Sequence, residues 1–141
     1  MAMSATLKDE AGAPSRRGVM LWTGRVMSTL VVAFLLMDAT MKLLALPIVA
    51  TTGQALGWSP NTALPLGVIV LACAVLYAWP RTAVLGAVLV TGLLGGAIAT
   101  HMRVGSPLFS HTLFGVYLGL MTWGGLYLRE PRLRAIFPLR G

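Results

Sequence analysis

The residues best able to do chemistry in this sequence are an aspartate, a lysine, an arginine and two histidines: Asp38, Lys42, Arg103, His101 and His111. Asp38 and Lys42 are four residues apart, a spacing that places both on one helix face and lets them pair. His101 and Arg103 end one long apolar run, and His111 begins the next. Because cationic nitrogen donors suit an anion or a polarised carbonyl group, we predict that these five residues bind a ligand.

A metal centre does not match this set, because two histidines ten residues apart and one carboxylate lack a dense ligand spacing such as HxxxH. The guanidinium of Arg103 would also repel a cation. The sequence has no GxSxG motif, Walker-type phosphate loop or nucleophile–base arrangement. Its one cysteine, Cys73, has no partner for a disulfide or a CxxC redox pair. The sequence therefore predicts no metal site, and it assigns neither a catalytic residue nor a cofactor.

The chain that must position these residues is too apolar for a soluble domain. Of its 141 residues, 57% are hydrophobic and 11% are charged, and its mean hydropathy is +0.80, whereas a soluble domain is about 25% charged. The formal net charge is +7, but the basic residues do not form a stripe interleaved with aromatic residues. This pattern argues against nucleic-acid binding. This composition excludes a soluble enzyme and a disulfide scaffold, and it predicts an integral membrane protein in contact with the lipid bilayer.

Four apolar runs predict an all-α fold, an integral membrane four-helix bundle with up-down-up-down connections. A membrane-spanning helix needs about 20 residues, and each run approaches or exceeds that length. We expect a polar N-terminal tail over residues 1–18, a membrane domain over residues 19–130 and a basic tail over residues 131–141. The predicted spans are residues 21–46, 61–79, 82–100 and 108–128.

Basic residues gather before the first span and after the last one, and such residues remain on the cytoplasmic side of a membrane. Both termini are therefore predicted to be cytoplasmic, in a multi-pass protein of the cell inner (plasma) membrane. The uncharged segment 47–60 is predicted to be an extracytoplasmic loop. The five polar residues then lie near the outer face, where they either line a ligand pocket or act as interfacial side chains that reach the headgroups.

Glycine spacing predicts close helix contacts. Gly92 and Gly96 in the third span, and Gly115 and Gly119 in the fourth, form two GxxxG pairs, which let helix backbones approach each other. We expect these faces first to pack within the bundle and second to contact another copy of the chain or another membrane subunit.

Several segments resemble the DoxX-like family of small four-helix membrane proteins. The resemblance covers residues 20–138, and its most specific part is the run GAIATHxRVG at residues 96–105. It implies a four-helix membrane protein with Asp38, Lys42, His101, Arg103 and His111 as a shared polar set. The segments that carry it are GRVMS at 24–28, FLLMDATMKL at 34–43, TGLLGGAIATHMRVGSPLFSHTLFGVYL at 91–118 and WGGLYLREPRLRAIFPLR at 123–140.

Proteins of this family are linked to quinone-coupled oxidation of small sulfur compounds and to oxidative-stress complexes, so the resemblance implies a redox-related or accessory role. The leading hypothesis is a protein that binds a small amphipathic, quinone-like ligand, with its head among the five polar residues and its tail in the apolar interior. A histidine would exchange protons there, because histidine titrates near neutral pH. Two alternatives remain open: a structural or assembly subunit of a larger membrane complex, and a small transporter. The transporter is less favoured because four spans show no evident inverted repeat.

Overall fold

The computed structural model describes residues 15–137, and the regular elements within this range are helical. The fold class is therefore all-α, as predicted. The longer elements are Arg16–Leu43 (α2), Ala63–Ala78 (α4), Ala83–Arg103 (α5) and Phe114–Arg129 (α6). The shorter ones are Pro47–Ala55 (α3), Pro60–Thr62 (η1, a 3₁₀ turn), Leu108–Thr112 (η2, a π-helical turn) and Pro131–Ile136 (α7).

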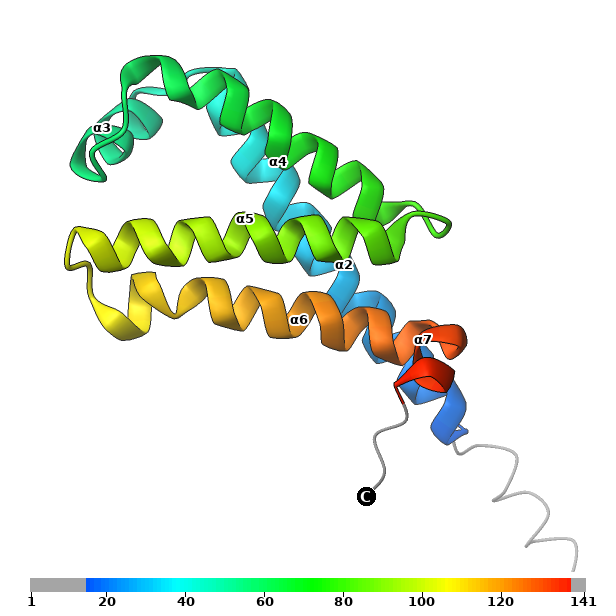
Figure 1. The fold of residues 1–141 in the computed structure, drawn as a ribbon. Coiled ribbons are helices and arrows are strands. Elements are labelled where there is room, and N and C mark those ends of the chain that lie inside the picture. Colours follow the sequence, from blue (N-terminus) through cyan, green and yellow to red (C-terminus); the bar gives the residue numbers. More distant parts are fainter. Residues whose placement is uncertain (1–14, 138–141) are drawn as a thin grey trace, which may run out of the picture.

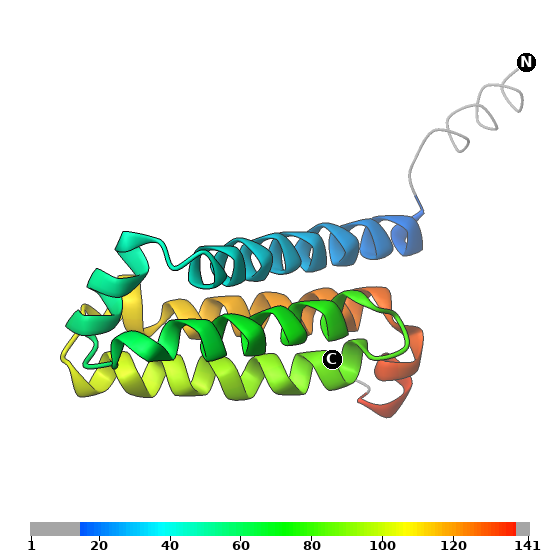
Figure 2. The same cartoon turned by 90° about the horizontal axis from the view of Figure 1, so that it is seen from above.

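The long helices α2, α4, α5 and α6 form a ring within the described part of the chain. In this ring α2 packs against α4 and α6, and α5 packs against the same two helices. Successive helices run in opposite directions, so the topology is up-down-up-down (Figure 1). The start of α2, the α4–α5 turn and α7 lie at one end, here termed the α7 end. The short helix α3 and the α5–α6 connection lie at the opposite end, the α3 end (Figure 2).

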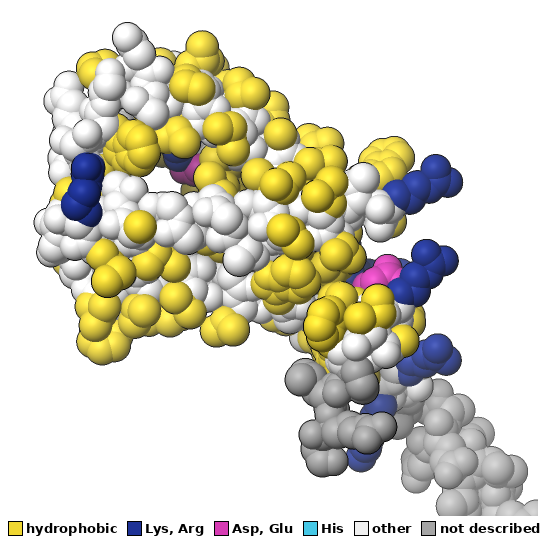
Figure 3. Space-filling view, in the orientation of Figure 1, with side chains coloured by type: hydrophobic (Ala, Val, Ile, Leu, Met, Phe, Trp, Pro, Cys, Tyr) yellow, Lys and Arg dark blue, Asp and Glu magenta, His cyan; other side chains and the backbone are white. Residues whose placement is uncertain are grey.

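Three segments are long and apolar enough to cross a membrane: Arg16–Leu43, Pro60–Ala78 and Ala83–Arg103, with mean hydropathies of 1.8, 1.9 and 2.0. Together, η2 and α6 form a fourth apolar segment beside them. Large hydrophobic side chains cover much of the outer surface (Figure 3), which water would disfavour and lipid accommodates. The chain is therefore a multi-pass membrane protein.

The first helix begins at a cap and ends at a bend. The Ser15 hydroxyl accepts a hydrogen bond of 3.1 Å from the Gly18 N–H, which satisfies one of the free donors at the start of α2. The helix ends at Leu43, three residues before the predicted end, because Ala45 adopts a positive φ of 48°. Helical hydrogen bonding cannot continue through that conformation.

The segment 47–60, predicted to be a loop, consists largely of the nine-residue helix α3 (Pro47–Ala55). The loop prediction was wrong here because a proline that closes one helix can also open the next. At the first helical position proline loses no hydrogen bond, since that N–H has no helical partner, and its φ already suits a helix.

Parts of both predicted tails are helical in the structure. The tail over residues 1–18 overlaps α2, which begins at Arg16, and residues 1–14 lie outside the described residues. The tail over residues 131–141 begins with α7, whose first turn is capped by Glu130 through a 3.3 Å hydrogen bond from the Arg132 N–H. Residues 138–141 again lie outside the described residues.

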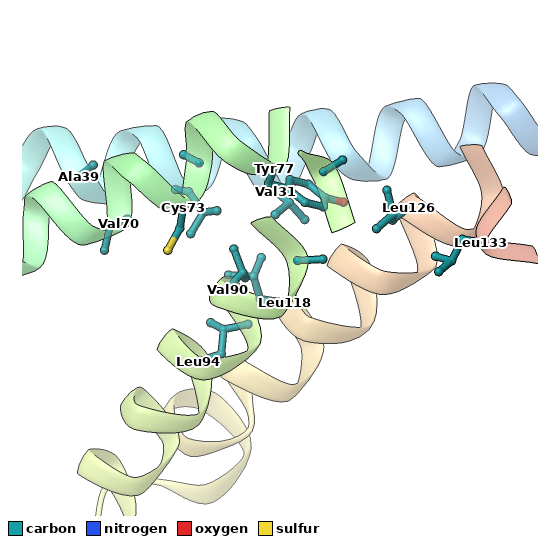
Figure 4. Packing of buried hydrophobic residues seen from close by; sticks show 14 residues of the cluster. Val31, Ala39, Val70, Cys73, Tyr77, Val90, Leu94, Leu118, Leu126 and Leu133 are labelled. Atoms are coloured by element: carbon teal, nitrogen blue, oxygen red, sulfur yellow. The ribbon is translucent and has the colours of Figure 1, made fainter. Parts of the chain in front are cut away.

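A cluster of buried hydrophobic side chains fills the interior of the ring (Figure 4). Tyr77 is the largest side chain that is fully buried. Its hydroxyl donates to the Thr122 carbonyl at 2.7 Å and lies 3.1 Å from Ser28 Oγ. Because the single phenolic proton goes to the carbonyl, Ser28 donates to Tyr77. These bonds link α2, α4 and α6.

Helices approach most closely at two glycines outside the predicted GxxxG pairs, Gly86 and Gly125. A Cβ added to Gly86 would lie 2.3 Å from the Tyr77 backbone nitrogen, so α5 touches α4 at this point. A Cβ added to Gly125 would lie 2.7 Å from Ser28 Oγ, where α6 crosses α2. Neither position tolerates a side chain without movement of a neighbouring helix.

The two predicted GxxxG pairs behave differently. Gly115 does pack within the bundle, because a Cβ there would lie 2.8 Å from Ile98 Cγ1, and one at Gly119 would make an ordinary contact of 3.7 Å with Leu94. At Gly92 and Gly96 an added Cβ would meet no atom of the described residues within 4 Å. The prediction that Gly92 and Gly96 form a close helix contact within the bundle was therefore wrong.

Candidate functional site

Two neighbouring cavities, of about 330 and 310 Å³, lie toward the α3 end of the bundle. The first is enclosed mainly by α2, α3 and the start of α4, and the second reaches between all four long helices. Both cavities are lined by the same five residues where they meet: Asp38, Lys42, Leu56, Trp58 and Leu66. The acidic and basic side chains of α2 therefore lie at the junction of the two cavities.

Asp38 and Lys42 form the predicted ion pair, in which Lys42 Nζ donates to Asp38 Oδ1. Their side chains are 33% and 21% exposed. They face the cavities because Leu35 and Ala39, on the neighbouring part of the same helix face, are buried in the core. A lysine ammonium has three N–H donors, and within the described residues the pair uses one of them. The remaining donors can bind a ligand.

His101 lies in the last turn of α5 and lines the second cavity together with the ion pair. Its Nδ1 lies 3.0 Å from Ser106 Oγ. Its ring centroid is 5.7 Å from that of His111, with the two rings tilted by 59°. The serine contact fixes the orientation of the imidazole through one ring nitrogen, which leaves Nε2 to contact another group.

Arg103 and His111 do not line either cavity. The Arg103 Nη2 donates to the Leu56 carbonyl at 2.8 Å and would lie 2.9 Å from a Cβ added to Gly57. Arg103 therefore ties the end of α3 to the end of α5 and positions a segment that both cavities share. His111 is exposed, and its Nδ1 lies 2.7 Å from the hydroxyl oxygen of Ser110.

Away from the ion pair, the second cavity is apolar. Its lining there comes from all four long helices and consists mainly of Phe34, Leu35, Val70, Leu93, Leu94 and Leu118. Phe34 also packs against Phe114, with ring centroids 5.1 Å apart. A cavity with a polar junction at one end and an apolar wall at the other can hold a small amphipathic molecule.

Sequence reasoning missed several residues of these cavities. Leu56 and Trp58 line both cavities. They reach the cavities because α3 folds the segment between α2 and α4 back over the bundle. The signal for α3 was available: an uncharged apolar stretch opened by Pro47 is typical of a short helix. Gly92 and Gly96 also line the second cavity. Their GxxxG spacing predicted a helix contact, and no other pattern in the sequence indicated that they border a cavity.

Among residues 15–137, no group of three or more His, Cys, Asp or Glu side chains could hold a metal ion. Cys73 is buried and does not line either cavity. The ionisable side chains that line the two cavities are therefore those of Asp38 and Lys42, at their junction, and of His101, in the second cavity.

Comparison with known proteins matches residues 26–125 to the model of the DoxX-like family. This segment covers more than two thirds of the chain, and it includes the ion pair of α2 and the histidines near the α5–α6 connection. No curated protein and no solved structure matches the sequence significantly. The family match agrees with the all-α membrane architecture, and the chain belongs to the DoxX-like family.

Proposed function

We propose that this DoxX-like membrane protein binds a small amphipathic ligand, of a quinone-like class, at the junction of the two cavities. The polar head would lie beside Asp38, Lys42 and His101, and the tail would occupy the apolar part of the second cavity. The observation that carries this proposal is the partly buried ion pair that lines both cavities. A pair that only anchored the helix would be expected to reach the headgroups instead.

The available donors favour an oxygen-bearing head. Lys42 can donate to a ligand oxygen while it stays paired with Asp38, and a hydrogen bond from a charged donor is stronger than one between neutral groups. His101 is held by Ser106 through Nδ1, so Nε2 is the ring nitrogen left for the ligand.

The size of the second cavity favours a small ligand. Its volume of about 310 Å³ is at the small end of the range for ligand pockets.

A redox-related or accessory role is part of the proposal. His101 lines the cavity, and its ring neighbour His111 is exposed, so a proton of the ligand head could exchange with solvent through the two histidines. Arg103 would act as a positioning residue, since it holds the Leu56 segment against the cavities. In this proposal the α3 end faces away from the cytoplasm.

The proposal is tested by the binding of decylubiquinone, a quinone with a ten-carbon tail, to the purified protein in detergent. Saturable quenching of tryptophan fluorescence reports binding, because Trp58 lines both cavities. We expect Lys42→Gln to raise the Kd at least tenfold, since a hydrogen bond from a charged group contributes about 1.5–3 kcal/mol. His101→Phe should raise the Kd several-fold.

His111→Phe is the matched control, because it makes the same change at a histidine that does not line a cavity. Its Kd should equal that of the wild type. Circular dichroism and gel filtration check that each variant keeps its helices and its size. The proposal fails if the wild type does not bind decylubiquinone, or if Lys42→Gln and His101→Phe bind it as tightly as the wild type does.

An assembly role is the second candidate, favoured by the open glycine face of α5. A Cβ added to Gly92 or Gly96 would meet no atom within 4 Å in the described part of the chain, so a partner helix could approach there. In that case Gly96→Leu would lower the mass of the complex in mild detergent, as measured by light scattering, while His101→Phe would leave the mass unchanged.

A further inference from the structure

The second cavity opens sideways between two helices. α4 and α5 separate toward the α3 end (Figure 1), and a space-filling view shows a hollow between them with an acidic side chain at its bottom (Figure 3). The cavity at this place is lined by Leu66 and Val70 of α4 and by Gly92 and Gly96 of α5, with Asp38 of α2 beneath. The opening therefore leads from the side of the bundle to the ion pair.

Two glycines of α5, Gly92 and Gly96, widen the opening because they have no side chains. Near the α7 end the same two helices touch, since a Cβ added to Gly86 would lie 2.3 Å from the Tyr77 nitrogen. Toward the α3 end the two helices diverge (Figure 1). About 15 Å further along α5, a Cβ added to Gly96 would meet no atom of the described residues within 4 Å, and the same holds for Gly92 one turn earlier. These two glycines therefore leave their part of the cavity wall without a side chain, while Leu93 and Ala97 line the rest of the α5 side.

This gap lies at the depth of the hydrocarbon core. Gly92 and Gly96 follow the first residue of α5 by about 14 and 20 Å in a helix about 31 Å long, and the hydrocarbon core is about 30 Å thick. The side chains of Leu85, Val88 and Leu89 on the same helix are exposed and apolar. The medium outside the opening is therefore lipid chains and not water.

We infer that the opening between α4 and α5 is a lateral passage through which an apolar chain dissolved in the bilayer reaches the cavity. The inference rests on the proposed function and deepens it, because it restricts the ligand to molecules with a hydrocarbon tail that partition into the membrane. Gly92 and Gly96 set the width of the passage, and a branched side chain at either position would narrow it. The ion pair then receives the head of a molecule that arrives from the side.

The test uses phosphatidylcholine vesicles in which a fraction of the lipid carries a photoreactive diazirine on an acyl chain. After irradiation, mass spectrometry locates the labelled residues. Val70 and Leu94 line the cavity and are only 2% and 9% exposed, so a lipid chain labels them only if it enters. We expect both to be labelled in the wild type and the labelling to fall at least fivefold in Gly96→Leu.

Gly95→Leu is the matched control. Gly95 is as open as Gly96, but it does not line the cavity, so labelling of Val70 and Leu94 should stay at the wild-type level. Gly92→Leu provides a second blocking variant if Gly96→Leu does not fold. The inference is overturned if exposed Leu85 is labelled in the wild type while Val70 and Leu94 are not. It is also overturned if the folded blocking variants are labelled like the wild type.

This readout needs no bound ligand, so its failure differs from failure of the proposed function. Binding of decylubiquinone without labelling of Val70 would mean that the ligand reaches the ion pair by another route. Labelling of Val70 without binding of decylubiquinone would leave the passage in place and remove the quinone-like ligand.

Discussion

At the scale of single residues, the buried hydroxyl of Tyr77 holds three helices together. It bonds to Ser28 on α2 and to the Thr122 carbonyl on α6, while the Tyr77 carbonyl accepts from Arg129 Nη2 at 3.1 Å. The Arg129 guanidinium also lies 5.2 Å from the centre of the Tyr77 ring. In a bilayer, van der Waals packing and such polar contacts hold helices together, because lipid provides no hydrophobic drive for their association.

We therefore expect Tyr77→Phe to destabilise the protein by about 0.6 kcal/mol, the average measured for hydrogen bonds between membrane helices, and by no more than about 1.7 kcal/mol, the largest value measured. Unfolding by sodium dodecyl sulfate in mixed micelles measures the change. Tyr117→Phe is the matched control, since Tyr117 is 45% exposed and should lose almost nothing. Equal stability of Tyr77→Phe and Tyr117→Phe would show that the three-helix contact contributes no stability.

At the scale of elements, the fold depends on where helices touch and where they separate. The α4–α5 pair does both, with contact at Gly86 and separation toward the α3 end (Figure 1). Gly95, on the opposite face of α5, borders open space. Replacement of a glycine by alanine should therefore have opposite effects on stability at different positions of α5. An alanine favours the helix over glycine by about 0.5–1 kcal/mol, but only where its methyl group has room.

We predict that Gly86→Ala destabilises the protein by about 2 kcal/mol or more, since the added methyl group would overlap the Tyr77 backbone and overpacking costs about 1–3 kcal/mol. Gly95→Ala should be neutral or stabilising by up to about 1 kcal/mol. Thermal denaturation in detergent, followed by circular dichroism, gives the order of Tm values. A Gly86→Ala variant as stable as Gly95→Ala would contradict the close approach of α4 and α5.

At the scale of the whole molecule, the distribution of charge predicts the orientation in the membrane. The first residues of α2, the α4–α5 turn and α7 share the α7 end (Figure 2), and the basic residues of that end are Arg16, Arg17, Arg81, Arg129, Arg132 and Arg134. The α3 end carries Arg103 as an exposed base. Because basic flanks remain cytoplasmic, we expect the α7 end to face the cytoplasm.

Cysteine labelling tests this orientation. In a Cys73→Ala background, Ser59→Cys at the α3 end should react with an impermeant maleimide added to intact cells. Pro80→Cys, in the α4–α5 turn, should react only after the cells are permeabilised. The unchanged chain is the control, because its one cysteine is buried and should stay unlabelled. The reverse labelling pattern would place the α7 end outside the cytoplasm and the α3 end inside it.

Part of the fold and of the site could be predicted from local sequence. The long apolar runs predicted the helices, and the spacing of Asp38 and Lys42 predicted their ion pair. The ends of helices were harder to predict, since Pro47 proved to open α3 where we expected a loop. The candidate residues near the α5–α6 connection were identified by type, but their division between the cavity (His101) and its rim (Arg103 and His111) was not.

The sequence by itself determined that this chain is a membrane protein of long helices with an ion pair on the first of them. Backbone groups in lipid must be satisfied within each helix, and an i,i+4 pair is set by one helix alone. Only the tertiary structure decided that Gly86 joins two helices while Gly92 and Gly96 border a cavity. Helix crossing points depend on side chains far apart in the chain, so identical residue spacings can produce a contact in one place and an opening in another.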